Sequence, residues 1–302
     1  MRLRAVWLLL LLSAWAGAEE PLDKVLSRLA EEAAVFLEVA PRTVSEETFR
    51  QRLDVRPSLL RPRRDPVGGA PPRGGFRTRT IVSEYGYSTF AESPNVLHEF
   101  RQVISVDGKE VRSRNRARLS LSMGVNSRDD RTKRKMLREL EQYGLTSAVV
   151  DLGQVILLFG RRRLADYQFQ FSRHEQAGAG RASVYAFRQV GGAGSVTVFQ
   201  GRAARREALQ GEVWVRESDS LPLRVVLRTG WEDERHIVWS EAAVDYSMSV
   251  HGVLLPASVV HREYVDETLQ VENLFRYTPF RRFSADAEIK FEETPAEVSP
   301  RK

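Results

Sequence analysis

Much of the chain alternates between apolar and polar residues with the period of a β-strand. Tyr167, Phe169 and Phe171 alternate with Asp166, Gln168 and Gln170. The same alternation of apolar and polar residues continues in the segments 184–189, 195–200, 221–228, 244–250 and 269–277. Successive side chains of a strand point to opposite faces, so each segment has one apolar face. The pattern predicts a sheet with one covered side and one side in water.

Short connections between these segments favour antiparallel neighbours, because parallel strands need crossovers of about a dozen residues or more. Asp107-Gly108 fits the type I′ turn of a tight hairpin after the strand that ends at Val106. Eight or more twisted strands in series tend to curl. We therefore expect a mainly β, α+β fold: a curled antiparallel sheet, or half-barrel, over residues 79–291, with its apolar positions on a concave inner face.

Two segments have helical spacing instead. Residues 21–38 begin with Pro21 and repeat apolar residues at helical spacing up to Phe36 and Leu37. This predicts an amphipathic helix within an N-terminal helical segment, 19–53. The helix is expected to pack on the sheet, and a lid or partner-binding role is the alternative. Ser127 and Asp130 can form a capping box before a second helix near 128–143.

The remaining segments carry weaker signals. The apolar run 148–159 is typical of a buried strand interrupted at Gly153. Residues 54–78 are rich in proline, glycine and arginine, which predicts a mobile loop. Residues 292–302 contain three acids and two prolines, so we expect a disordered tail.

Residues 1–18 have the features of a cleaved signal peptide. Arg2 and Arg4 precede an apolar run, and Ala16-Gly17-Ala18 offers the small residues of a cleavage site. The run is shorter than the about 20 residues of a membrane-spanning helix. The chain has no cysteine, which excludes a cysteine lipid anchor, disulfides and thiolate chemistry. We expect cleavage after Ala18 and a periplasmic or secreted protein.

The charge of the chain adds little to this picture. The net charge is +6, and it falls to +4 when Arg2 and Arg4 are removed with the signal. Basic runs occur at 61–64, 133–135, 161–163 and 202–206. Predicted export argues against nucleic acid as their partner. Weak contact with an anionic membrane surface remains a hypothesis, with salt-sensitive binding as its signature.

The sequence contains no recognised catalytic motif, and it predicts no catalytic, cofactor-binding or metal-ligating residue. His261 near Glu263, or His98 beside Glu99, would form a site only if folding brought further carboxylates close. Aromatic residues on the alternating strands are the better candidates, since they can line a curved apolar surface. The candidate lining comprises Phe169, Phe171, Phe199, Trp214, Trp239, Tyr246 and Tyr277.

The sequence carries two resemblances to known families, and the first of them implies a half-barrel. The segment from Gly211 to Arg224, with Trp214 and Pro222 on either side of a short polar turn, resembles the hairpin of the periplasmic lipoprotein carrier family. That likeness implies a half-barrel fold. The Val106-Asp107-Gly108 strand end, with Tyr277 before the Arg282-Phe283 pair, is similar to uncharacterised secreted proteins of soil bacteria. It implies no activity, and neither likeness supplies a ligand residue.

Three functions remain open at this point. The leading hypothesis is an exported, non-enzymatic envelope protein that binds an apolar ligand, such as an acyl chain, a lipoprotein or a hydrophobic peptide, on the concave face. The alternative is a structural or protein-interaction domain whose core is filled by its own side chains. The third is a secreted hydrolase with an unrecognised site. A sizeable apolar cavity between the sheet and the helix 21–38 would favour the first.

Overall fold

The computed structural model describes residues 22–55, 75–145, 151–178, 180–192, 196–200, 203–233 and 236–282. Its helices are α1 (Leu22–Val39), η1 (Ala40–Arg42), α2 (Arg114–Val125), α3 (Asp130–Leu137), η2 (Glu141–Tyr143), η3 (Val155–Phe159) and α4 (Arg161–Leu164), where η marks a 3₁₀ helix. The predicted signal peptide, its cleavage site and the predicted tail lie outside the described residues.

The strands of the first half are β1 (Thr43–Val55), β2 (Gly75–Phe90), β3 (Ser93–Val106), β4 (Lys109–Glu110), β5 (Tyr167–Ala177), β6 (Gly180–Gln189) and β7 (Val196–Gln200). Those of the second half are β8 (Ala203–Glu207), β9 (Gln210–Arg216), β10 (Pro222–Asp233), β11 (His236–Met248), β12 (Leu254–Val265), β13 (Thr268–Tyr277) and β14 (Arg281–Arg282).

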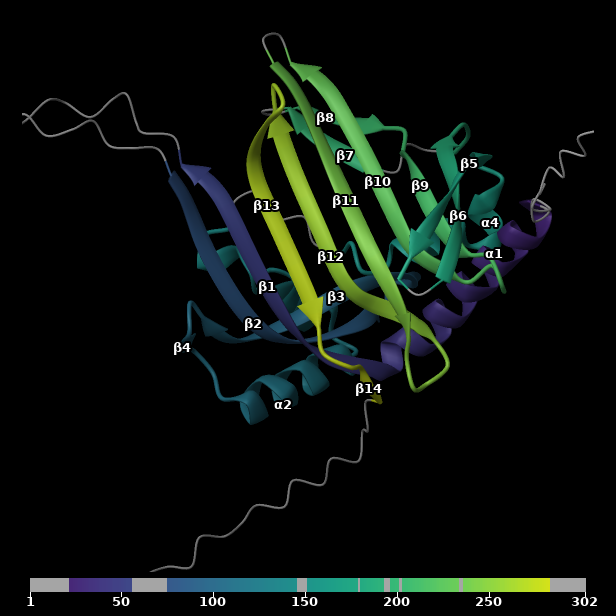
Figure 1. Cartoon of the computed structure of the whole chain (residues 1–302). Coiled ribbons are helices and arrows are strands. Elements are labelled where there is room, and N and C mark those ends of the chain that lie inside the picture. The colour runs from purple at the N-terminus through teal and green to yellow at the C-terminus, as the bar shows by residue number, and fades with distance from the viewer. Residues whose placement is uncertain are drawn as a thin grey trace, which may run out of the picture.

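Twelve strands form one curled, unclosed antiparallel sheet, as the alternation predicts (Figure 1). The strand order is β4-β3-β2-β1-β13-β12-β11-β10-β9-β6-β5, and β14 pairs with β1. Most neighbours follow each other in the chain, but β13 returns to pair with β1. This pairing joins the two halves of the chain into a single sheet, whose two edge strands are β4 and β5.

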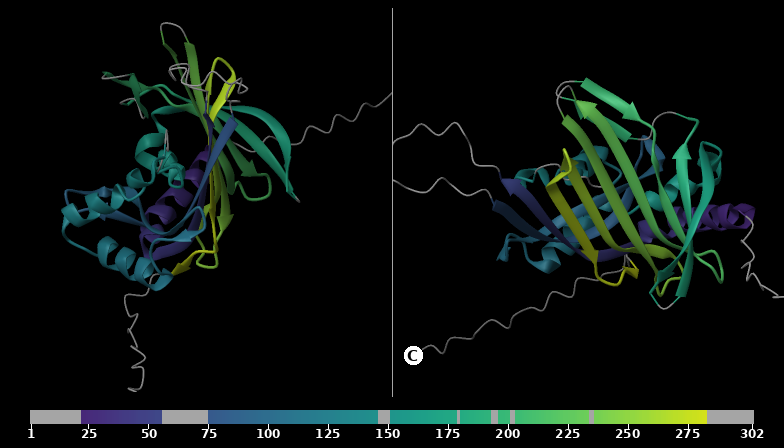
Figure 2. Two further views of the ribbon diagram at one scale, coloured as in Figure 1. Left: turned by 90° about the vertical axis from the view of Figure 1, so that its left-hand side faces the viewer. Right: turned by 45° about the horizontal axis from the view of Figure 1, so that its top comes forward.

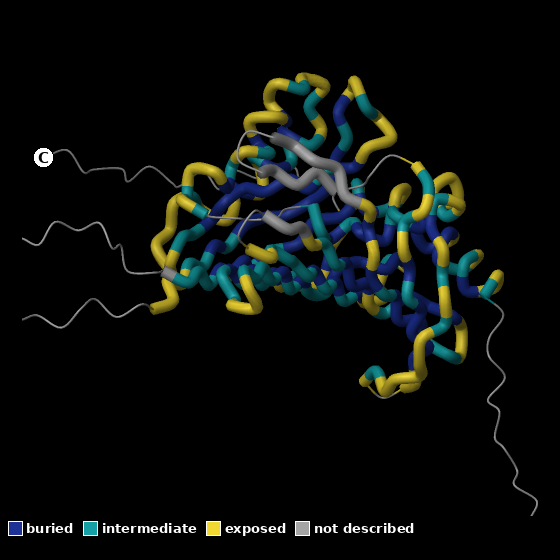
Figure 3. The backbone as a smooth tube through the Cα atoms, turned by 90° about the horizontal axis from the view of Figure 1, so that it is seen from above, coloured by how far each residue is buried: buried dark blue, intermediate teal, exposed yellow. Residues whose placement is uncertain are grey.

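The inner face of the sheet, which carries Phe49, Val259 and Phe275, is covered by α1 and η3. Val25, Leu29 and Phe36 of α1 are fully buried in one core with Ile156 and Phe159 of η3. In Figure 2, α1 runs along one side of the sheet, and Figure 3 shows buried segments through the middle of the molecule. The predicted N-terminal helix is therefore confirmed, and side chains fill the space between it and the sheet.

Helix α2, which was not predicted from the sequence, packs on the opposite face of β2 and β3. Its Leu121 is buried in a second core with Phe100 of β3 and Met136 of α3. At this end the sheet is therefore covered on both faces. Gly86 of β2 lies below Leu121, and a β-carbon there would be 3.6 Å from Leu121 Cδ2.

The predicted helix 128–143 is shorter than expected. Helix α3 ends at Leu137, and the chain continues through a turn into η2 before Gly144, which adopts a left-handed conformation. The capping residue is Asp129, whose carboxylate accepts hydrogen bonds from the Arg131 amide and the Thr132 hydroxyl. Ser127 accepts the Asp129 amide instead, so the capping box predicted for it was wrong.

The strand predicted over 148–159 was also wrong. Its described part is an irregular turn followed by η3, in which Val155, Ile156 and Phe159 are buried between α1 and the sheet. A short apolar run buried on every side has the same composition as a buried strand. Tyr246 of β11 fixes the turn, because its hydroxyl accepts the Ile156 amide and donates to the Gly153 carbonyl.

Strand β1 corrects the expectation of a helical segment up to residue 53. Its inner positions carry Glu47 and Gln51, which are buried although they are polar, so the apolar alternation of a half-buried strand is broken. The predicted loop 54–78 is likewise bounded differently, since β1 reaches Val55 and β2 begins at Gly75. Residues 56–74 lie outside the described residues.

The hairpin at Asp107-Gly108 is confirmed. Both residues have positive φ angles, 51° and 79°, as a type I′ turn requires. Val106 pairs with Lys109 directly across the turn. Strands β7 and β8 form a separate two-stranded sheet, so the segment 195–200 does not join the main sheet.

Candidate functional site

Aromatic rings gather on the inner face at the end of the sheet formed by β5, β6 and β9. Phe187 of β6 lies between Phe169 of β5 and Phe159 of η3, with ring centroids 5.9 and 5.3 Å away. Phe171 packs against Tyr185, with centroids 5.7 Å apart. We call these five residues, Phe159, Phe169, Phe171, Tyr185 and Phe187, the aromatic cluster.

The cluster depends on one glycine. Gly211 of β9 lies opposite Phe187 in the strand register. A β-carbon at Gly211 would be 3.0 Å from the Phe187 ring and 1.8 Å from the Val226 carbonyl oxygen. Only a residue without a side chain fits there, and the Phe187 ring occupies the free space.

Phe169 and Phe171 are the exposed part of the cluster. Both are half-buried, whereas Phe159, Phe187 and Tyr185 are buried. They lie on β5, the edge strand, so the solvent reaches their rings from the side where the sheet stops. The cluster is thus a continuation of the core that ends in two partly open apolar side chains.

The structure divides the seven predicted lining residues among four places. Phe169 and Phe171 lie together at the β5 edge. Tyr246 and Tyr277 share the inner face but belong to the filled core, where Tyr277 contacts Tyr85 and Phe280. Trp214 packs with Val184 and Val226 on the opposite face, and Phe199 lies on β7.

Trp239 also lies on that opposite, outer face. It stacks on Tyr264 of β12, with ring centroids 4.0 Å apart and an angle of 6° between planes. Trp214 donates a hydrogen bond to Glu175 and is flanked by Arg173 and Arg224. Both tryptophans are therefore outer-face residues, and the prediction that they line the concave face with Phe169 was wrong.

Phe159, Tyr185 and Phe187 were not among the lining residues predicted from the sequence. Phe187 and Tyr185 belong to the alternating segment 184–189, so their shared face was a usable signal. Phe159 gave none, because η3 resembled a strand and its position over the sheet depends on tertiary contacts.

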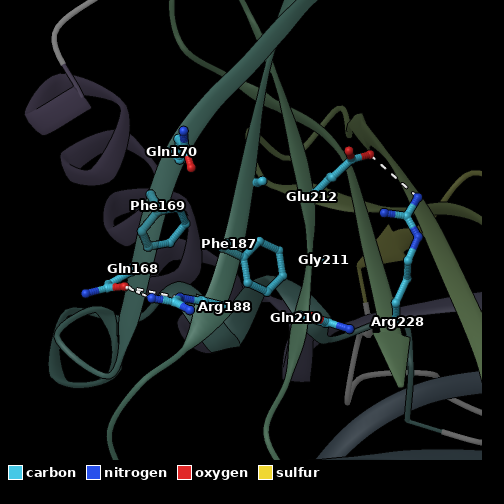
Figure 4. A pocket seen from close by; sticks show the side chains of 10 residues that line it. Gln168, Phe169, Gln170, Phe187, Arg188, Gln210, Gly211, Glu212 and Arg228 are labelled. Atoms are coloured by element: carbon cyan, nitrogen blue, oxygen red, sulfur yellow. Dashed lines mark hydrogen bonds and ion pairs between the residues drawn. The ribbon is translucent and has the colours of Figure 1, made fainter. Parts of the chain in front are cut away.

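The outer face behind the cluster contains a hollow of about 920 Å³ (Figure 4). It is lined by polar side chains, those of Gln168, Gln170, Arg188, Gln210, Glu212 and Arg228, and also by Phe169, Ala186, Phe187 and Gly211. Arg188 donates two hydrogen bonds to Gln168, and Arg228 forms ion pairs with Glu212 and Glu241. The hollow therefore combines polar side chains with two residues of the aromatic cluster.

A closed ion cluster lies on the inner face at the other end of the sheet. Arg101 of β3 donates two hydrogen bonds to Glu47 of β1 and one to Glu99, each 2.8 Å long. The three side chains are at most 4% exposed. Burial raises the pKa of Glu99 to about 7, reinforced by the charges of Asp151 and Glu47 and opposed by Arg101.

A ladder of buried polar groups continues from this cluster. Gln51 donates to Asn273 at 2.8 Å, and the Asn273 amide nitrogen lies 3.2 Å from His261 Nδ1. Burial lowers the pKa of His261 to about 4. The hydrolase hypothesis required such perturbed groups to meet in a cavity. Here Glu99 and His261 are enclosed by the core, where a substrate has no access.

The basic runs have different surroundings. Arg161 and Arg162 are exposed on α4, directly before β5. Lys133 of α3 is buried, with its ammonium donating to the Thr89 carbonyl, so the run 133–135 is in part structural. Among the described helices, none has the length and apolar character to cross a membrane.

No family model matches the chain, and no curated protein matches it in sequence. Solved structures do match. A LolA superfamily protein from Nitrosomonas europaea has 10% identity and a TM-score of 0.31, over 84% of this chain and 94% of that protein. A DUF1329 family protein from Desulfovibrio piger has 10% identity and a TM-score of 0.35, over 91% and 98%.

A Vibrio parahaemolyticus domain described as an outer membrane lipoprotein-sorting protein has 10% identity and a TM-score of 0.33, over 88% of this chain and 95% of that domain. Such values carry no information about activity, ligand or partner.

Proposed function

We propose that this chain is an exported, non-enzymatic envelope protein that binds an apolar ligand at the β5 end of the inner face. The observation that supports the proposal is the half-exposure of Phe169 and Phe171 at the rim of a buried aromatic cluster. Proteins normally bury such rings or use them for binding. The ligand lies at the edge of the sheet in this proposal, since α1 and η3 fill the space beneath the helix.

The filled core favours a second candidate, a protein-interaction domain. Leu29, Phe36, Ile156 and Phe159 are fully buried, so this part of the inner face has no room for a ligand. Both candidates use the same open edge, and they differ in whether the apolar ligand is a small amphiphile or part of a protein.

A binding titration with an uncharged naphthylamine probe tests the proposal. Phe169→Ser and Phe171→Ser should each weaken binding by about 10- to 100-fold, because a buried phenylalanine side chain contributes about 1.5–3 kcal/mol. Trp239→Ser is the matched control: it removes a half-buried aromatic ring from the outer face and should leave binding unchanged.

Far-UV circular dichroism and thermal unfolding of each variant separate loss of binding from loss of fold. The proposal is abandoned if the wild-type protein binds no apolar probe, or if the Trp239 variant loses as much affinity as the two phenylalanine variants.

A further inference from the structure

The two edge strands of the sheet, β4 and β5, differ in length and in charge. Strand β4 has only the residues Lys109 and Glu110, and a short charged strand is a poor template for pairing. Strand β5 is eleven residues long, and its first part, from Tyr167 to Ser172, contains no charged residue. In the described part of the chain β5 pairs only with β6.

The backbone of β3 beyond β4 is covered by side chains. The Glu99 amide donates to Asp151, the Val103 amide to Glu139, and the Val103 carbonyl accepts from Arg112. Gln102 donates to the Arg101 carbonyl. Several of the backbone groups that β3 would offer to another strand are therefore occupied.

The register of β5 shows which of its backbone groups face outward. The Val190 amide donates to the Asp166 carbonyl, and the Gln189 amide donates to the Leu209 carbonyl on the other side of β6. Backbone groups alternate in direction along an antiparallel strand. Gln168 and Gln170 therefore bond to β6, while the amide and carbonyl of Phe169 point to the open edge, where no described residue bonds to them.

Phe169 thus offers two things on one residue: a half-exposed ring on the inner face and an unpaired backbone amide and carbonyl at the edge. An antiparallel strand beside β5 would place a side chain on the inner face opposite the Phe169 ring. The backbone of the same residue would form hydrogen bonds with the amide and carbonyl of Phe169. Every second residue of the added strand should then be apolar, because it lies beside the aromatic cluster. The residues between them should be polar, because they lie beside Gln168 and Gln170 on the outer face.

We propose that the apolar ligand is an extended polypeptide segment that joins the sheet as an antiparallel strand beside β5. This inference rests on the proposed function and specifies its ligand. Strand addition of this kind draws affinity from backbone hydrogen bonds and specificity from alternate side chains. The exposed Arg161 and Arg162, just before β5, favour acidic residues at the adjacent end of the segment.

A second copy of this chain fits less well. If Phe169 lies opposite its own copy, Arg173 is placed against Ala165, close to the arginines of α4. Like charges in these positions oppose the pairing. The occupant is therefore a segment of another protein with alternating apolar residues and an acidic end.

The test uses a fluorescent synthetic peptide in which valine and threonine alternate and a pair of glutamates closes one end. Bound beside β5, its valine amides face Phe169 and its threonine amides face solvent. N-methylation of the valine amides should weaken binding to the purified protein by about tenfold or more, because it removes backbone hydrogen bonds. N-methylation of the threonine amides is the matched control and should leave affinity unchanged.

A charge exchange provides a second arm. The double substitution Arg161→Glu and Arg162→Glu should weaken binding of the glutamate peptide. It should strengthen binding of a peptide that carries lysines in place of the glutamates. The inference is overturned if all methylated peptides bind alike, if only the naphthylamine probe binds, or if sedimentation shows a dimer that excludes the peptide. The proposed function survives these results, because it is tested separately by the naphthylamine titration of the wild type and of the Phe169, Phe171 and Trp239 variants.

Discussion

Gly153 lies so close to Glu99 that a β-carbon at position 153 would be 3.0 Å from Glu99 Oε1. This oxygen has no hydrogen-bond partner among the described residues, while the other oxygen accepts from Arg101. The turn that leads into η3 thus packs against a buried carboxyl group that has a hydrogen-bond partner at only one of its oxygens. Its protonation and the stability of the fold are therefore linked.

Glu99 should make the protein less stable as the pH rises. The pKa of its carboxyl is about 7 in the folded protein and 4.5 as its ordinary value. Between pH 4.5 and 7 the folded state holds a proton that the unfolded state has lost. Stability therefore falls across this window by about 1.4 kcal/mol per pH unit at most, and the loss is complete above pH 7.

Urea unfolding of wild type and Glu99→Gln between pH 4 and 8 measures this contribution. The difference in free energy of unfolding between them should change across pH 4.5–7 and become constant above it. Glu84→Gln is the control, because Glu84 is also buried but pairs with Arg118 and Arg281. Identical pH profiles for wild type and Glu99→Gln would contradict the assignment.

His261 should act in the opposite direction. Burial lowers its pKa from 6.5 to about 4, so between these values the unfolded state binds a proton that the folded state does not. Stability should therefore fall as the pH decreases from 6.5 to 4. His261→Gln should flatten this part of the profile, which the same urea titration measures. His236, an exposed residue paired with Asp266, provides the control substitution.

Arg101 should be among the most costly residues to replace in the ion cluster. Arg101→Met leaves Glu47 and Glu99 buried without a cation, and breaking a buried pair costs about 3–5 kcal/mol. Arg173→Met removes an exposed guanidinium that pairs with Glu175 and Glu212, and should cost about 1 kcal/mol or less. Chemical unfolding at pH 7 compares the two. Equal losses would show that burial of Arg101 has no energetic consequence.

Gly211→Ala should disturb the aromatic cluster. The added carbon meets the Val226 carbonyl and the Phe187 ring, and overpacking of this kind costs about 1–3 kcal/mol. Gly180→Ala is the control, since a β-carbon there meets nothing within 4 Å. Thermal unfolding should show a lower midpoint only for the Gly211 variant. A normal midpoint in that variant would mean that β9 can move away from β10 without cost.

Elements with regular periodicity could be predicted from the sequence. The helix 21–38, the hairpin at Asp107-Gly108 and the alternating strands after Tyr167 each follow from local spacing, and the curl of the sheet follows from their number. Strand β1 and η3 could not be predicted in the same way. Glu47 and Gln51 are polar residues on a buried face, and they are tolerated because Arg101 and Asn273 satisfy them from distant strands.

The candidate site could be predicted only in part. Alternation identified Phe169 and Phe171 but could not say which aromatic residues on other strands share their face. The outer position of Trp214 follows from its register with Val184 and Arg224, and that register is a long-range property. Phe159 reaches the cluster from η3, whose conformation depends on the sheet and α1 around it.

The covered edge at β3 and β4 limits how far this protein can assemble through its sheet. A sheet with two open edges can add further strands or copies at both ends without limit, which is how edge pairing produces fibres. Here growth beyond one event is disfavoured: once a strand occupies β5, the opposite edge offers only the short, charged β4 and a β3 backbone that is partly bonded to side chains. Saturation of that edge should therefore give a complex with one occupant per chain, and concentrated protein should form pairs with its partner and not polymers.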